Sequence, residues 1–458
     1  MDYQGKKVAV VGLGISNRAL ISFLSEKGAQ ITACDQKDPS EIADLQELQK
    51  MPIVLQLGDG YLRNLASFEE VFLTPGMRKD LPEIAEAAKA GVRLSTEVGL
   101  FMEGCPALMV GVTGSSGKTT TTTLLGQMMA TSRRETFVGG NIGVPLIGEL
   151  DRITPDAQVV LELSSFQLEL TRTSPQISVV TNITPNHLDV HPSMEAYIEA
   201  KTNIYGFQGS EDHFITNLDD PICVKMAAQA PGKVYFFSIT SRPERGAYIE
   251  DDRLYYRVDS KAGVPVCRVS DIKLRGVHNV GNVLTAITAA ALAGIGPGAM
   301  AEVIKGFTGV AHRLEPVTVW QNVQFVNDSI ATTPTRAAAG LRSFDEPIIL
   351  ICGGYDKKIP FEEMIRAGKG RVKAYIILGA TADLIERTIH TEYQDVPPDI
   401  HRVESLEEAV QTSIRLGESG DVVLLSPGCA SYDMFESFTQ RGELFRQLVF
   451  ELTGVKTA

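Results

Sequence analysis

The segment GVTGSSGKTTTTTLL, residues 111–125, combines the residue types that can hold the phosphates of a nucleotide. An apolar run leads into a loop of small residues, and a lysine and threonines open the helix expected after it: Gly114, Ser115, Ser116, Gly117, Lys118, Thr119 and Thr120. Backbone N–H groups of such a loop bind phosphate oxygens, Lys118 supplies a positive charge, and the hydroxyl of Thr119 can bind magnesium. The usual pattern has glycine where this chain has Val112, but the part of the loop that touches the reacting phosphates is intact. We therefore predict that this loop binds ATP or GTP.

Charged residues at the ends of two further apolar runs are candidate metal ligands. Glu162 lies in VVLELSS, and a carboxylate among apolar residues is costly unless a metal ion or a salt bridge compensates its charge. NHLDVH places His187, Asp189 and His191 within five residues after the strand expected at residues 177–181. Such a cluster can bind magnesium or phosphate. Lys201, in EAYIEAKTNIY, is by composition alone an ordinary helical lysine.

The N-terminal segment KKVAVVGLGISNRALISFLSEKGAQITACD predicts a βαβ unit. A strand at residues 8–11, a glycine turn, a helix at 16–27 and a strand at 30–34 are followed by Asp35. Gly12 and Gly14 are present, but Asn17 occupies the third glycine position of the dinucleotide-binding pattern. The turn therefore fits either a nucleotide site or close packing of a helix on a sheet. A dehydrogenase would need the third glycine and an acid–base site, which the sequence does not offer.

Apolar runs ending in small or polar residues recur along the chain, with helical stretches between them, as expected for buried parallel strands. A chain of 458 residues is too long for one core. We predict three α/β domains in series: a Rossmann-like domain at residues 1–97, a P-loop ATPase-type parallel-sheet domain at 98–309, and a second Rossmann-like domain at 310–458.

The composition limits the classes of partner. A net charge of −13 argues against a broad nucleic-acid or anionic-membrane surface. The most apolar run, residues 283–296, is Ala-rich and too short to cross a bilayer, so we expect a buried helix there. The first residues lead directly into a strand pattern without a secretory signal, which predicts a cytoplasmic protein. Six widely spaced cysteines indicate reduced thiols.

Nine motifs, in order over essentially the whole chain, resemble those of the Mur ligases: TGSSGKTT, GGNIG, LELSSFQLE, NHLDVH, AYIEAKTNIY, GVHNVGN, HRLE, NDS and SPGCASYDMFESFTQRG. These are ATP-dependent enzymes that add amino acids to the peptidoglycan precursor. LELSSFQLE and the C-terminal motif resemble most the members that add D-glutamate to UDP-N-acetylmuramoyl-L-alanine. The resemblance implies an acyl-phosphate intermediate, closure of the domains about linkers near residue 309, and a monomeric enzyme with these two small-molecule substrates.

The resemblance also implies roles for single residues. Ile15, Ser16, Asp35 and the turn from Thr74 to Gly76 match positions around uracil and pyrophosphate, and Asn141 and Ser164 match positions near the sugar and its lactyl-alanine arm. Two magnesium ions are implied, held by Thr119, Glu162, His187 and a Lys201 carbamylated by carbon dioxide. Asn282, Arg313 and Asp328 match ATP contacts, and Thr332, Lys357, Ser431 and Phe438 match positions around the glutamate. Lys118, His187, Lys201 and Arg313 match the catalytic residues.

One departure and several alternatives accompany the resemblance. Some family members have lysine after NDS, where this chain has Ile330, so no cationic role carries over to that position. The neighbour Lys358 leaves open which lysine of GGYDKK binds glutamate. An L-glutamate ligase, or a folate-type glutamate ligase, would share the ATP domain, although the N-terminal βαβ unit with Asp35 disfavours the second. A regulatory ATPase without ligation would leave the glutamate-site motifs unexplained.

Overall fold

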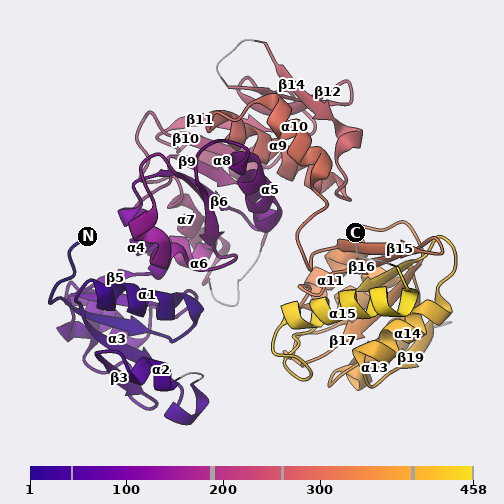
Figure 1. Ribbon diagram of the computed structural model, residues 1–458, viewed down its shortest axis with the longest axis horizontal. Coiled ribbons are helices and arrows are strands. Elements are labelled where there is room, and N and C mark those ends of the chain that lie inside the picture. Colours follow the sequence, from indigo (N-terminus) through magenta and orange to yellow (C-terminus); the bar gives the residue numbers. More distant parts are fainter. Residues whose placement is uncertain (43–44, 186–190, 259–261, 394–397, 456–458) are drawn as a thin grey trace. The chain divides into compact units, whose positions relative to one another are not determined.

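Three β-sheets with helices on their faces organise the chain. The structure is a computed structural model, and it describes residues 1–42, 45–185, 191–258, 262–393 and 398–455 (Figure 1). Contacts divide the chain into two compact units, each described by itself: Met1–Ile272 with Val277–Phe307, and Lys273–Gly276 with Thr308–Ala458. The first unit contains two sheets and the second contains one, which confirms the predicted α/β class. The domain boundaries near residues 97 and 309 stay a prediction.

The first sheet is parallel, with strand order β3-β2-β1-β4-β5. The KVAVV run of β1 has four buried residues, as expected for a central strand with both faces covered. The chain moves from β1 to one side and then returns to its other side at β4, so ligands are expected at the carboxyl ends of these two strands. The elements are β1 Lys7–Val11, α1 Ile15–Glu26, β2 Gln30–Asp35, α2 Leu45–Gln49, β3 Ile53–Leu57, β4 Glu70–Leu73, α3 Pro82–Lys89 and β5 Arg93–Ser95.

The second sheet has the order β14-β13-β12-β11-β10-β9-β6-β8-β7. It is parallel from β7 to β12, and β12 to β14 extend it as an antiparallel meander. The strands are β6 Leu108–Thr113, β7 Thr136–Gly140, β8 Gln158–Glu162, β9 Ile177–Val180, β10 His213–Asn217, β11 Lys233–Phe237, β12 Gly246–Glu250, β13 Arg253–Arg257 and β14 Val264–Arg268. The helices are α4 Glu97–Gly104, α5 Lys118–Ala130, α6 Ser165–Leu168, α7 Met194–Thr202, α8 Pro221–Ala227, α9 Val277–Leu292 and α10 Pro297–Gly306.

Helix α9 is the Ala-rich helix expected from the sequence, and it is buried from Asn282 to Ala290. It packs against α5, the helix that follows the phosphate loop. Among the described helices, none is long and apolar enough to cross a membrane. The six cysteines are free thiols, and five of them are buried.

The third sheet, in the second unit, has the order β15-β16-β20-β17-β18-β19. Only the β15–β16 pair is antiparallel among its paired strands. One apolar cluster lies under α11, α12 and α13, and a separate cluster lies under α14 and α15, so helices cover both faces. The elements are β15 Glu315–Trp320, β16 Val323–Asn327, α11 Pro334–Leu341, β17 Ile348–Gly353, α12 Glu362–Gly368, β18 Val372–Leu378, α13 Ala382–Glu392, β19 Asp399–Arg402, α14 Leu406–Leu416, β20 Val422–Leu425 and α15 Phe438–Thr453.

Strand β20 is last in the chain but lies between β16 and β17. The connection that leaves β16 runs into α11 on one face, whereas the one that leaves β20 runs into α15 on the other face. Such a switch point opens a crevice at the carboxyl ends of the two strands, where α/β proteins bind ligands. The second unit therefore has its expected ligand site at the loops that follow β16 and β20.

Candidate active site

The loop between β6 and α5 has a backbone that only glycine adopts easily at two positions. Gly114 has a φ of +146° and Gly117 a φ of +80°. A Cβ atom on Gly117 would lie 2.2 Å from Oδ1 of Asn282, which places the α9 asparagine directly against the loop. Lys118 begins α5, and its Nζ donates hydrogen bonds to the carbonyl oxygens of Gly114 (3.0 Å) and Ser115 (3.3 Å). The structure thus brings the predicted ATP residues of the first unit together.

The segment after β9 fixes the conformation of this loop. Ser115 N–H donates to the carbonyl of Asn182 (2.9 Å), and Ser116 N–H donates to the Asn182 side chain (3.0 Å). The Thr181 hydroxyl donates to the Ser116 carbonyl (2.6 Å). Sequence reasoning missed Thr181 and Asn182, although they stand in TNIT directly after the apolar strand ISVV. They hold the loop in shape because β9 is paired with β6.

Lys201 of α7 is buried beside the loop, with a relative exposure of 1%. Its Nζ donates to Thr113 Oγ1 (3.1 Å) and to the carbonyl oxygen of Gly114 (3.1 Å). It forms no ion pair with any residue that the structure describes. Burial, together with the charge of Lys118, lowers the pKa of the Lys201 amine well below its ordinary value, although Glu162 opposes the shift. Burial therefore favours the uncharged amine more strongly here than at an exposed lysine.

Glu162 ends β8, next to β6 in the sheet, and is 2% exposed. Its Oε1 accepts a hydrogen bond from the Asn141 side chain (2.8 Å), while its Oε2 is buried without a partner among the described residues. A buried carboxylate oxygen that no protein donor satisfies, at the strand ends beside a phosphate loop, fits a magnesium ligand. Thr119, one residue into α5, is half-buried at the same loop.

Of the predicted metal ligands in NHLDVH, the structure describes only His191. His187 and Asp189 lie outside the described residues. His191 is described and serves a packing role: its Nε2 lies 2.9 Å from the Ser165 hydroxyl, and its ring stacks on Phe166. Within the described ranges, no group of three or more His, Cys, Asp and Glu residues could hold a metal ion. The predicted set of Thr119, Glu162, His187 and Lys201 thus stays a prediction.

In the first sheet, the predicted substrate residues gather at the carboxyl ends of β1, β2 and β4. The two carboxylate oxygens of Asp35 accept hydrogen bonds from the backbone N–H groups of Leu13 (2.7 Å) and Lys37 (2.9 Å). Asn17 is buried and donates to the carbonyl oxygens that end β1 and begin the turn. Ile15 is 79% exposed at the start of α1, available to a ligand.

The remaining predicted substrate positions adjoin these elements or Glu162. Thr74 packs against Gly12, since a Cβ atom added to Gly12 would lie 2.9 Å from the Thr74 side chain. Ser16 is half-buried in the first turn of α1, and Gly76 is exposed in a left-handed turn after β4. Ser164, two residues after Glu162, caps α6 by accepting a hydrogen bond from Gln167 N–H (3.2 Å).

In the second unit, Asp328 follows β16 and is buried. Its carboxylate accepts hydrogen bonds from the Ser426 hydroxyl (2.8 Å) and from the Leu314 N–H (3.2 Å), next to Arg313. Burial raises the pKa of Asp328 to about 7. Those hydrogen bonds and the positive charges of Arg313 and Arg336 oppose that rise without cancelling it. The structure thus brings Arg313 and Asp328 together.

The predicted glutamate residues lie in the loops around the switch point. Thr332 is half-buried before α11, Lys357 is exposed after β17, and Ser431 is buried after β20. Phe438 begins α15, and its carbonyl oxygen accepts a hydrogen bond from the Ser329 hydroxyl (2.7 Å). Three of these four positions therefore follow strands that are neighbours in the sheet.

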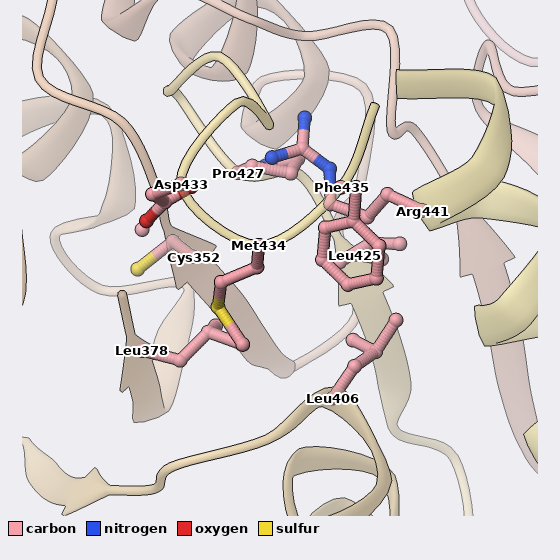
Figure 2. A pocket seen from close by; sticks show the side chains of 11 residues that line it. Cys352, Leu378, Leu406, Leu425, Pro427, Asp433, Met434, Phe435 and Arg441 are labelled. Carbon is pink, nitrogen blue, oxygen red and sulfur yellow. The ribbon is translucent and has the colours of Figure 1, made fainter. Parts of the chain in front are cut away.

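Arg441 of α15 connects two of these loops, and sequence reasoning did not assign it a role. It is 3% exposed and donates to the hydroxyl and carbonyl of Ser329, and to the carbonyls of Cys429 and Ala430. Burial lowers its pKa to about 10. Its guanidinium and the side chains of Met434 and Phe435 line a cavity of about 10 Å³ (Figure 2). That volume admits about one water molecule, so this cavity is not an amino-acid site.

The fold and the loop together define a three-sheet α/β protein with a glycine-rich loop of the phosphate-binding type after β6. Models of three Mur ligase domains match consecutive parts of the chain. They are "Mur ligase MurD-like, N-terminal domain" at residues 6–96, "Mur ligase middle domain" at 112–290 and "Mur ligase, glutamate ligase domain" at 312–429. The chain belongs to the Mur ligase family.

Relatives match over nearly the whole length. The UDP-N-acetylmuramoylalanine--D-glutamate ligase of Acetivibrio thermocellus is 45% identical over 453 residues, which is 97% of this chain and 96% of the relative. The enzyme of the same name from Symbiobacterium thermophilum is 45% identical over 451 residues, 98% of each chain. That from Clostridium kluyveri is 43% identical over 452 residues, 98% of this chain and 97% of the relative.

Solved structures share the fold at lower identity. The UDP-N-acetylmuramate-alanine ligase MurC of Thermotoga maritima has a TM-score of 0.58 at 19% identity, covering 96% of this chain and 98% of that one. MurF of Acinetobacter baumannii has a TM-score of 0.61 at 15% identity, covering 98% and 94%. MurF of Thermotoga maritima, solved in complex with ADP, has a TM-score of 0.55 at 16% identity, covering 98% and 96%. The likeness to these structures agrees with the three-domain α/β fold expected from the sequence.

Proposed function

We propose that the chain is an ATP-dependent ligase that joins D-glutamate to UDP-N-acetylmuramoyl-L-alanine during peptidoglycan precursor synthesis. Relatives of 43–45% identity over nearly the full length carry that activity in their names. The observation in the structure that supports it best is the phosphate loop with Glu162 and the buried Lys201 at its side. That arrangement suits a phosphoryl transfer, in which catalysis is mostly positioning and charge neutralisation.

The reaction proceeds in two steps. A carboxylate oxygen of the alanyl group attacks the γ-phosphorus of ATP, the bond to the β-phosphate oxygen breaks, and an acyl phosphate and ADP form. The glutamate amine, having lost a proton, then attacks the acyl carbon, and the tetrahedral intermediate expels inorganic phosphate to leave the amide. Lys118 and the N–H groups of its loop hold the phosphates, with Asn282, Arg313 and Asp328 as further ATP contacts.

The first sheet binds the nucleotide end of the acceptor substrate. The uracil and pyrophosphate lie at the loops after β1, β2 and β4, and the exposed Ile15 supplies an apolar contact. Residues along this path are Ser16, Asp35, Thr74 and Gly76, with Asn141 and Ser164 towards the lactyl-alanine arm. The glutamate is bound by Thr332, Lys357, Ser431 and Phe438 of the second unit. When bound, magnesium neutralises phosphate charge, and Thr119, Glu162 and His187 are its ligands.

Lys201 carries a carbamate in the working enzyme. The buried amine, with two neutral oxygen acceptors and no carboxylate partner among the described residues, is poised to add to the carbon of carbon dioxide. A C–N bond forms, the nitrogen loses a proton to water, and the product is a carboxylate-like anion. This anion provides hard oxygen ligands beside Glu162, suited to a second magnesium ion.

Three further properties complete the proposal. The boundaries between the three domains lie near residues 97 and 309 of the chain, the enzyme is a monomer, and it works in the cytoplasm. The oligomeric state is checked by light scattering during size-exclusion chromatography, with the mass of one chain as the expected result.

The function is tested by phosphate release with UDP-N-acetylmuramoyl-L-alanine, ATP and each glutamate enantiomer in turn. We expect release with D-glutamate, and release with the L-enantiomer alone would contradict the proposal. Lys118→Ala should abolish ligation while the UDP substrate still binds, since the residues predicted to contact that substrate lie on other elements. Lys305→Ala, on the exposed side of α10, is the matched control and should turn over normally.

The carbamate is tested by 13C NMR of the protein equilibrated with 13C-bicarbonate. A carbamate carbonyl resonance is expected in the wild type and not in Lys201→Ala. The same variant should be nearly inactive and partly rescued by added acetate or formate. A wild-type spectrum without that resonance, or a fully active variant, would refute the carbamate.

A further inference from the structure

Three positively charged side chains lie around the switch point of the third sheet and have no ion-pair partner among the described residues. Arg336 lies in the first turn of α11, Lys357 in the loop after β17, and Arg441 near the start of α15. No carboxylate of the described residues forms a salt bridge with any of them. Two acids stand in the same loops, but Asp356 accepts a hydrogen bond from Lys358 N–H (2.6 Å) and Asp433 accepts one from Ala380 N–H (3.1 Å).

Backbone hydrogen bonds hold the loops that carry these cations together. Gly428 N–H, after β20, donates to the carbonyl of Ala331 after β16 (2.9 Å). Tyr355 N–H, after β17, donates to the carbonyl of Ala430 after β20 (3.0 Å). The loops thus form one rigid edge along three neighbouring strands, as a preorganised binding site requires.

The electrostatics of this edge favour an anion. Burial of part of its side chain, with the positive charges of Arg336 and Arg441, lowers the pKa of the Lys357 amine. The positive charge of Arg336 also lowers the pKa of the buried Asp328, against the larger effect of burial. Its electrostatic field therefore reaches the loop after β16 as well as Lys357 in the loop after β17. A cation in the first turn of a helix opposes the helix dipole, and three cations that repel one another are costly unless an anion is bound. Ile330, at the same edge, brings no charge.

The three cations differ in what they can offer a ligand. Arg441 is buried, and its donors are used on Ser329, Cys429 and Ala430, so it positions the loops and adds to the field. Arg336 and Lys357 are exposed, and their side chains make no hydrogen bond to the described residues. A guanidinium fork matches a carboxylate through two parallel hydrogen bonds, and the phosphates already have the loop of Lys118 in the other unit.

We propose that Arg336 is a substrate-binding residue which, together with Lys357, binds a carboxylate of the incoming glutamate. This inference rests on the proposed function, because it assigns a contact for that substrate. Arg336 does not take part in the chemistry; it sets the affinity for a dicarboxylic amino acid. Loss of a charged hydrogen-bonding pair of this kind weakens binding by about 10- to 100-fold.

The test compares Arg336→Gln with Arg342→Gln in the full-length enzyme. Arg342 ends the same helix, is exposed and pairs with Glu363, so its loss should leave all constants unchanged. Arg336→Gln should raise the KM for D-glutamate about 10- to 100-fold while the KM for ATP changes less than about twofold. Arg336→Lys, which keeps the charge, should recover part of the loss.

The outcomes separate this inference from the proposed function. If the wild type ligates D-glutamate and Arg336→Gln has an unchanged KM for it, the inference is wrong and the function stands. An increase in the KM for ATP without one for glutamate assigns Arg336 to the phosphates and also overturns the inference. A wild type that ligates no glutamate overturns both.

Discussion

Replacing Asp328 by Asn should make the second unit more stable at high pH than at low pH, relative to the wild type. The carboxylate is buried after β16 and accepts hydrogen bonds from Ser426 and Leu314. Asparagine keeps the shape, because its oxygen can accept from the Leu314 N–H while its amide donates to the Ser426 hydroxyl. The substitution therefore removes the charge and little else.

The magnitude follows from the pKa of Asp328, raised by burial from 3.8 to about 7. Below pH 3.8 the carboxyl is protonated in both the folded and the unfolded chain, so its full contribution to stability is present. As the pH rises to 7, only the unfolded chain releases the proton, and the folded state loses stability. One pKa unit is worth about 1.4 kcal/mol, so the loss between pH 5 and pH 8 is about 2.5 kcal/mol for the wild type and none for Asp328→Asn.

Urea unfolding followed by tryptophan fluorescence measures this difference selectively. Trp320 is the single tryptophan of the chain, and it lies on β15, in the same sheet as β16. The free energy of unfolding of Asp328→Asn minus that of the wild type should rise by about 2.5 kcal/mol from pH 5 to pH 8. Asp345→Asn, an exposed site, is the control and should show no such trend. A difference independent of pH would refute the buried, raised-pKa carboxyl.

Three further substitutions test the packing of the site. Gly117→Ala forces a left-handed alanine and a contact with Asn282, so we expect ATP binding by calorimetry to weaken at least about tenfold; Gly148→Ala, in open space, should not change it. Asn17→Ala removes one buried and one partly buried hydrogen bond and should cost about 1–3 kcal/mol, and an unchanged thermal midpoint would contradict this. Arg441→Lys breaks most of four hydrogen bonds, so the Trp320 transition should move by about 2–4 kcal/mol.

Local patterns predicted the phosphate loop and the N-terminal turn well, because short-range rules decide both. The loop needs glycine at two left-handed positions, and the sequence has glycine at both of them. The incomplete fingerprint of the first sheet also has a local explanation. Asn17 lies where a third glycine would allow close packing, and it compensates by donating to the carbonyls of Val11 and Gly12. A missing glycine thus did not mean a missing turn.

Relations that depend on strand order could not be predicted from the sequence. Thr181 and Asn182 hold the phosphate loop because β9 lies beside β6, although β7 and β8 stand between them in the chain. In the same way, β20 inserts between β16 and β17, which brings Arg441 to Ser329 across 112 residues. Parallel strands are paired by packing over long separations, and no periodicity of the sequence encodes which strands become neighbours.

The meander of β12 to β14 was missed for a different reason. β13 and β14 are partly exposed and contain charged residues, and all three strands have only five residues, so their apolar runs are short. The signal that could have found it is the pair Asp251 and Asp252, both left-handed, which joins β12 to β13 as a two-residue hairpin. The residues of this turn therefore indicate the hairpin more clearly than the residues of its strands.

Each unit keeps polar side-chain groups that no described residue compensates, and these groups match the ligands proposed for that unit. In the first unit, Glu162 buries an oxygen without a donor, and Lys201 is buried without a carboxylate partner among the described residues. In the second, Arg336 and Lys357 offer donors to no described acceptor. Each arrangement costs stability in the ligand-free chain, because buried or crowded charge is compensated only in part. A cation and a carbamate relieve the first, and a carboxylate relieves the second. Ligands that bind only the folded chain should therefore stabilise it, with magnesium acting through Glu162 in the first unit and glutamate acting through Arg336 and Lys357 in the second.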